Sequence, residues 1–275
     1  MSQFCCVAAN RPDQSSISGA GTPARAASDD PIRISRAAQL TEVLLEHVLE
    51  RATRFRGQVF PAQSALYERL ASDGQSPKAL MISCADSRVV PELITQAAPG
   101  DLFVCRNAGN IVPPFSQANG GVSSAVEYAV VALGVRDIVV CGHSDCGAMK
   151  AFSQPEALQR MPNVAAWLRH AQAAHSVVCS AYHGLDSKAE TRALSLENVV
   201  VQINHLRTHP SVASAIAQGE LSLHGWFFEI ETGRILAFNG ETEQFELVVE
   251  GRSLPVALSP NRRLAARDFV GMAAE

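Results

Sequence analysis

The sequence predicts an α/β protein: a mainly parallel central sheet with one antiparallel edge strand, flanking helices and an N-terminal helical arm. Short apolar runs alternate with helical patterns, which is typical of buried parallel strands joined by crossover helices. The last two strand-like runs flank the turn ETGR at 231–234, which indicates an antiparallel hairpin. The chain has 275 residues and 47% hydrophobic content, enough for a sizeable core.

Three apolar runs are short enough to be buried strands, and the hairpin supplies two more. The expected parallel strands are KALMIS (78–83), DLFVCR (101–106) and DIVVCG (137–142), and the hairpin spans 221–239. The expected helices cover 91–97, 120–133 and 189–207, with a mostly helical stretch over 149–190 broken at Pro155, Pro162 and Gly184. Ligand sites in such sheets lie at the carboxyl ends of the strands.

The N-terminal part of the chain divides into two kinds of segment. Residues 1–30 are rich in Ser, Ala, Gly, Pro and Asp and lack a sustained apolar period, so we expect a disordered arm. Apolar residues three to four apart predict an amphipathic helix over 35–55, and a second short helix is expected over 61–70. We expect residues 31–70 to pack on the core or on a partner subunit.

Charge and composition exclude several classes of partner. The formal net charge is −4, so no overall basic excess is available to recruit nucleic acid or an anionic membrane. No apolar run approaches the roughly 18 residues needed to span a bilayer. The first ten residues lack a cationic segment followed by a long apolar one, and we expect a cytoplasmic protein. In a reducing compartment the seven cysteines are better explained as core residues, metal ligands or nucleophiles than as a disulfide framework.

The unusual residues follow the first and third predicted strands. Cys84, Asp86 and Arg88 come directly after the first strand, and His143 and Cys146 come directly after the third. Taken singly, each has an ordinary structural explanation, but adjacent parallel strands bring their carboxyl ends within a few ångströms of each other. Two thiolates and one imidazole suit Zn²⁺, and three protein ligands leave a fourth position where water can ionise near pH 7. We therefore expect residues 31–275 to form a single zinc-dependent catalytic domain.

Several longer segments resemble the β-class carbonic anhydrases. They are CADSRV (84–89), PGDLFVCRNAGNIVPP (99–114), SAVEYAV (124–130) and CGHSDCGAMKA (141–151), with support from GQSPK (74–78) and LHGWFFEIETGRI (223–235). The resemblance extends over residues 59–239. Gln75 together with RNAGN (106–110) is similar to the plant-type branch of the family.

This resemblance implies a metal site and a reaction. It implies zinc held by Cys84, His143 and Cys146, and reversible hydration of carbon dioxide to bicarbonate and a proton. The zinc-bound hydroxide is expected to be oriented by Asp86, which Arg88 holds through a two-pronged hydrogen bond. In some members of the family the aspartate moves onto the metal, so Asp86 is a possible fourth ligand in a closed state.

The resemblance also implies residues that bind the small-molecule substrate. Gln75 matches an amide that hydrogen-bonds the substrate, and Phe103, Ala108 and Tyr128 match residues that line an apolar pocket. The backbone N–H of Gly147 is the expected donor to bicarbonate. Tyr128 is expected to reach the pocket of a neighbouring subunit, in a homodimer or a dimer of dimers.

Three alternatives stay open at this level. The same fold and metal could hydrolyse COS or CS₂, which are linear relatives of carbon dioxide. A zinc-stabilised protein without catalysis would carry a fourth protein ligand. An enzyme with a cysteine nucleophile would use Cys84 or Cys146 with His143 and need no metal.

Overall fold

The computed structural model describes residues 46–116, 120–251 and 256–257. The chain divides into two compact units, Met1–Asp73 and Gly74–Glu275. The arm expected over 1–30 and the first part of the helix expected over 35–55 lie outside the described residues. The single domain expected over 31–275 stays a prediction.

The described part of the first unit is helical. Residues 46–54 form a helix that continues into a π-helical turn, Phe55–Val59, a 3-10 turn, Phe60–Ala62, and helix α2, Ser64–Asp73. The second helix therefore begins at Ser64 and not at Pro61, because Pro61 lies inside the 3-10 turn. Between residues 46 and 73 no side chain is buried. Packing of this segment on the core or on a partner stays a prediction.

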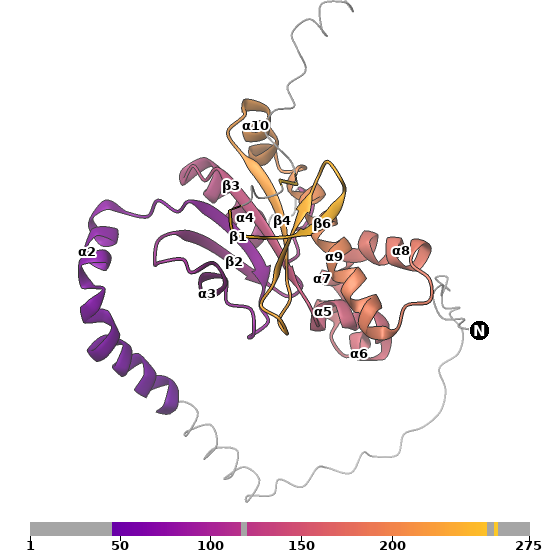
Figure 1. Cartoon of the computed structure of the whole chain (residues 1–275), viewed down its shortest axis with the longest axis horizontal. Coiled ribbons are helices and arrows are strands. Elements are labelled where there is room, and N and C mark those ends of the chain that lie inside the picture. Colours follow the sequence, from indigo (N-terminus) through magenta and orange to yellow (C-terminus); the bar gives the residue numbers. More distant parts are fainter. Residues whose placement is uncertain (1–45, 117–119, 252–255, 258–275) are drawn as a thin grey trace, which may run out of the picture. The chain divides into compact units, whose positions relative to one another are not determined.

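The second unit is built on one six-stranded sheet in the order β2-β1-β3-β4-β5-β6 (Figure 1). The strands are β1 (Ala79–Cys84), β2 (Leu102–Asn107), β3 (Asp137–His143), β4 (Ser222–Phe228), β5 (Ile235–Asn239) and β6 (Gln244–Leu247). The strands β2, β1, β3 and β4 run parallel, whereas β5 and β6 join antiparallel. The mainly parallel sheet flanked by helices is confirmed.

The antiparallel part of the sheet contains one strand more than the sequence predicts. The hairpin strand β5 lies between β4 and a further strand, β6, so β5 is not the edge. Only one residue of β6 is even partly buried. The polar–apolar alternation QFEL (244–247) covers only four residues, which is the shortest length that indicates a strand, and the sequence therefore does not predict β6.

Helices surround the sheet at the predicted places, with one addition. The described helices of this unit are α3 (Pro91–Thr95), α4 (Gly121–Glu127) with the π turn η3 (Tyr128–Ala132), α5 (Gly147–Lys150), α6 (Pro155–Gln159), α7 (Pro162–Leu168), α8 (Gln172–Ala181), α9 (Ser187–Leu206) and α10 (Pro210–Gln218), with the 3-10 turns η4 (Ala151–Ser153) and η5 (Arg169–Ala171). Two expected breaks are helix starts, because Pro155 and Pro162 occupy first-turn positions that need no N–H partner. Helix α10 was not predicted.

Helix α9 lies against β3 and β4, where two glycines allow a close approach. A Cβ at Gly142 or at Gly225 would come within 2.8 or 2.9 Å of a methyl group of Val199. Val199 itself is fully buried in the main core, with Leu80, Ile138 and Leu223 from the sheet. This contact sets the distance between helix α9 and the carboxyl end of strand β3, where His143 lies. Among the described helices, none is both long and apolar enough to cross a bilayer.

Candidate metal centre

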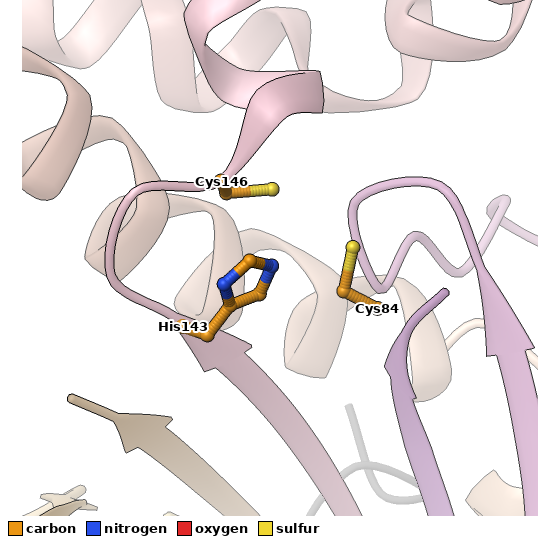
Figure 2. Close-up of side chains that lie close together, drawn as sticks. All are labelled: Cys84, His143 and Cys146. Atoms are coloured by element: carbon orange, nitrogen blue, oxygen red, sulfur yellow. The ribbon is translucent and has the colours of Figure 1, made fainter. Parts of the chain in front are cut away.

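Three side chains meet where β1 and β3 end. Cys84, His143 and Cys146 each offer a ligand atom, and these atoms lie within 4.8 Å of one another (Figure 2). The three residues are 5%, 0% and 1% exposed. Residues 59 positions apart are brought together because β1 and β3 are parallel neighbours with a common carboxyl edge. The structure thus assembles the three ligands expected from the sequence.

Each ligand is held by the element that carries it. Cys84 is the last residue of β1 and His143 is the last residue of β3. Cys146 is the N-terminal capping residue of the short helix α5. The turn between His143 and Cys146 is closed by Asp145, whose φ of 60° lies in the left-handed region. Asp, Asn and Gly tolerate that region best.

The imidazole of His143 is oriented to bind a metal. Its Nδ1–H donates to the Ser144 carbonyl oxygen at 2.8 Å, because a carbonyl can only accept. This leaves Nε2 as the acceptor nitrogen. Nε2 is buried and has no hydrogen-bond partner. A buried polar atom without a partner costs about 1–3 kcal/mol, and a metal ion at this position would remove that cost.

Contact between the two sulfur atoms favours the thiolate form of Cys84 and disfavours that of Cys146. A hydrogen bond from the Cys146 thiol, aided by the N–H of Gly109 at 3.4 Å, lowers the pKa of Cys84 well below its ordinary value. The same contact with the Cys84 sulfur, together with burial, raises the pKa of Cys146. Two buried thiolates in contact repel each other, and a divalent cation between them stabilises both. Two sulfurs and one nitrogen therefore fit zinc, and the described Asp, Glu, His and Cys residues add no fourth ligand to the group.

Asp86 and Arg88 form a closed ion pair beside this group. Arg88 Nε donates to Asp86 Oδ1 at 2.9 Å, and Arg88 Nη2 donates to Asp86 Oδ2 at 2.8 Å. The backbone N–H of Arg88 also donates to Oδ1 at 3.0 Å. These hydrogen bonds from Arg88 lower the pKa of Asp86 far below its ordinary value, so the carboxylate is charged throughout the neutral range. In this arrangement Asp86 faces Arg88 and is not one of the clustered ligands.

Comparison with known proteins assigns the chain. A family model described as carbonic anhydrase matches residues 79–235. The chain belongs to the carbonic anhydrase family. It is 52% identical to a carbonic anhydrase of Pseudomonas aeruginosa over 206 residues, which is 75% of this chain and 93% of that protein. It is 48% identical to carbonic anhydrase 1 of Escherichia coli O157:H7 over 216 residues, which is 78% of this chain and 94% of that protein.

Solved structures of carbonic anhydrases agree with the class expected from the sequence. The β-carbonic anhydrase CcaA superposes with a TM-score of 0.72 at 44% identity, over 74% of this chain and 99% of that one. A β-carbonic anhydrase of Coccomyxa, in complex with acetazolamide, superposes with a TM-score of 0.60 at 31% identity, over 70% of this chain and 84% of that one. The resemblance to the β-class is confirmed.

The substrate-binding residues expected for a carbonic anhydrase divide into two groups. Gly147 follows the ligand Cys146, and a Cβ at this glycine would meet no atom within 4 Å, so the space beside it is open. Ala108 precedes Gly109, which donates to Cys84, and the Ala108 carbonyl accepts from Trp167 Nε1 at 2.9 Å. These two residues lie beside the ligand group of their own chain.

The other three expected residues do not reach that group. Phe103 lies about 13 Å back along β2 from Asn107, the residue paired with Cys84. The ring of Tyr128 lies against Phe103, with centroids 5.9 Å apart, and Tyr128 is 48% exposed. Gln75 is exposed and precedes β1, at the end of the strand opposite Cys84. One chain by itself therefore does not assemble the expected pocket.

Two further residues, Arg106 and Asn198, support the carbonic anhydrase site, and the sequence analysis assigns a role to neither. Arg106 donates to the carbonyl oxygens of Cys84 and Asp86, at 3.1 and 2.8 Å, and so fixes the loop that carries both. Asn198 donates to the Gly109 carbonyl at 2.9 Å from helix α9. Asn198 is 1% exposed. A fully polar residue on the buried face of an amphipathic helix was the available signal, since buried amides need partners.

Proposed function

We propose that this enzyme reversibly hydrates carbon dioxide to bicarbonate and a proton, with zinc held by Cys84, His143 and Cys146. The observation that carries the proposal is the buried group of two sulfurs and one imidazole, with a partnerless Nε2 and no fourth ligand among the described side chains. Zinc with three protein ligands supplies a Lewis acid that lowers the pKa of water to about 7. The carbonic anhydrase family membership supports the same reaction.

The Asp86–Arg88 pair orients the attacking oxygen. Asp86 is charged and held by three hydrogen bonds from Arg88. A fixed carboxylate at the open side of the centre accepts the hydrogen of the attacking O–H group, so that a lone pair of that oxygen faces the substrate carbon. The backbone N–H of Gly147, next to open space, donates to a substrate oxygen. Pre-set hydrogen-bond partners of this kind need no rearrangement during the reaction.

A second copy of the chain completes the substrate pocket in this proposal. Gln75, Phe103 and Tyr128 lie away from the ligand group of their own chain, and the first and third are exposed. A homodimer or a dimer of dimers allows these three side chains to serve the metal centre of the partner. A solved chain of one of two tetrameric β-carbonic anhydrases of Sordaria macrospora is 29% identical to this chain, with a TM-score of 0.61.

Stopped-flow measurement of carbon dioxide hydration on zinc-loaded protein at pH 8 or above tests the function. We expect Cys84→Ser, His143→Ala and Cys146→Ser to lose zinc and turnover together. Cys105→Ser is the matched control, because this half-buried thiol lies outside the ligand group and should keep one zinc per chain. A zinc-saturated protein with no rate above buffer would contradict the proposed reaction, and full zinc content in the three ligand variants would contradict the proposed site.

A further inference from the structure

Asp145 makes more contacts than its place in the turn requires. The φ of 60° at this position requires only a residue that tolerates the left-handed region, and glycine adopts that backbone conformation without strain. Here the carboxylate is used as well: Oδ2 accepts from Arg88 Nη1 at 2.9 Å, and Oδ1 pairs with the ammonium group of Lys150. The backbone carbonyl of Asp145 accepts a further hydrogen bond from Arg88 Nη2 at 3.2 Å.

The guanidinium group of Arg88 is therefore held from two sides. One side donates twice to Asp86, and the other donates to the side chain and to the carbonyl of Asp145. The Arg88 side chain is 45% exposed, so without its second anchor it has room to turn toward solvent. Because Asp86 receives two hydrogen bonds from the same planar group, the plane of Arg88 sets the direction of the Asp86 carboxylate.

The position of Asp145 ties this pair to the metal ligands. Asp145 lies in the turn between His143 and Cys146, 57 residues from Arg88. The loop that presents two ligands therefore also carries the anchor for the partner of Asp86. Lys150, the last residue of α5, holds the far side of the Asp145 carboxylate. Charges alternate along the row Asp86, Arg88, Asp145 and Lys150.

We propose that Asp145 is a positioning residue, which keeps Asp86 directed at the open side of the metal centre and off the metal by anchoring Arg88. This inference rests on the proposed function. Without the Asp145 carboxylate, Arg88 loses its second anchor, and Asp86 becomes free to turn away from Arg88. A freed carboxylate next to a zinc ion with an open position is itself a suitable fourth ligand.

Two substitutions distinguish the contribution of the Asp145 carboxylate from that of the left-handed backbone conformation at this position. Asp145→Asn keeps the size of the side chain and its tolerance of the left-handed region, and it removes the charge. Asp145→Gly gives the turn its least strained residue and removes the carboxylate altogether. Glu231→Gln is the matched control, because Glu231 contacts the same turn by accepting from Ser144 at 2.8 Å and makes no contact with Arg88.

Turnover gives the first measurement. We expect both Asp145 variants to bind one zinc per chain and to lose at least about tenfold in kcat/KM, since small errors of position near reacting atoms are costly. The control should stay within about twofold. In an Asp86→Asn background, Asp145→Asn should change the rate by less than about twofold, because residues acting through one another are not additive. An equal loss in both backgrounds would overturn the inference.

Azide binding to the cobalt-substituted protein gives a measurement that does not depend on turnover. We expect azide affinity, followed by the visible absorption of cobalt(II), to fall severalfold in Asp145→Gly and to recover in Asp145→Gly with Asp86→Asn. Loss of a negative charge alone would strengthen anion binding, as Glu231→Gln will show. Unchanged or tighter azide binding in Asp145→Gly would refute the role of Asp145. If carbon dioxide hydration is absent but this azide pattern is found, the proposed reaction fails and the positioning role stands.

Discussion

The contact between α9 and the sheet predicts the effect of one added methyl group. Gly142 precedes the ligand His143, and a Cβ at this position would lie 2.8 Å from Val199 Cγ2 and 3.3 Å from the Ser195 carbonyl oxygen. Ordinary van der Waals contact begins at 3.4 Å. The substitution Gly142→Ala must therefore push Val199, which is fully buried, or lift α9 from β3.

The size of the effect follows from two opposing terms. Overpacking of a well-filled core costs about 1–3 kcal/mol. Replacing glycine in an extended segment returns about 0.4–1 kcal/mol, because the unfolded chain loses freedom. We expect Gly142→Ala to lower the free energy of unfolding by roughly 0.5–2 kcal/mol. In a Val199→Ala background the added methyl group has room, and the same change should be neutral or slightly stabilising.

Urea unfolding of the four proteins at one protein concentration measures this coupling. The interaction energy between the two sites should be at least about 1 kcal/mol. Gly121→Ala is the control, because a Cβ there meets no atom within 4 Å, and it should be neutral or stabilising. A neutral Gly142→Ala, or an equal penalty with and without Val199, would refute the close packing of α9 on β3.

Two further substitutions test the surroundings of the site. Asn198→Ala leaves the buried Gly109 carbonyl without its donor, so the free energy of unfolding should fall by about 1–3 kcal/mol. Because the N–H of Gly109 donates to Cys84, zinc affinity measured in a competition titration should weaken as well. If both values are unchanged, water replaces the amide. Burial raises the pKa of Glu229, but hydrogen bonds from a threonine and two arginines outweigh it and lower that pKa below its ordinary value of 4.5. Because the folded pKa is lowered, the stability from Glu229 is complete above pH 4.5 and is lost as pH falls through the folded value. Glu229→Gln should thus be less stable at pH 7 and lose less stability on acidification, and parallel pH profiles by thermal unfolding would contradict this.

Much of the fold was predictable because its signals are local. The apolar runs of β1 and β3 are continuous because both strands are almost wholly buried, whereas β2 has a similar run although it is only partly buried. The bounds that the sequence predicts for all three strands agree with the structure to within one residue. The exposed strand β6 has only the four-residue alternation QFEL (244–247) in place of a continuous apolar run, and the sequence does not predict it. The π-helical turn at Tyr128–Ala132 lies where the sequence predicts plain helix, because the same apolar spacing fits both kinds of helix.

The sequence by itself determined which residues offer sulfur, nitrogen and carboxylate ligands and which strands end in them, because residue chemistry and strand periodicity are local properties. Only the tertiary structure decided how these residues are supported. Asp145 meets Arg88 across 57 residues, and Asn198 meets Gly109 across 89. It also decided that Phe103 and Tyr128 contact each other away from the ligands of their own chain. Such contacts depend on strand order, register and helix placement, which arise from the packing of the whole core.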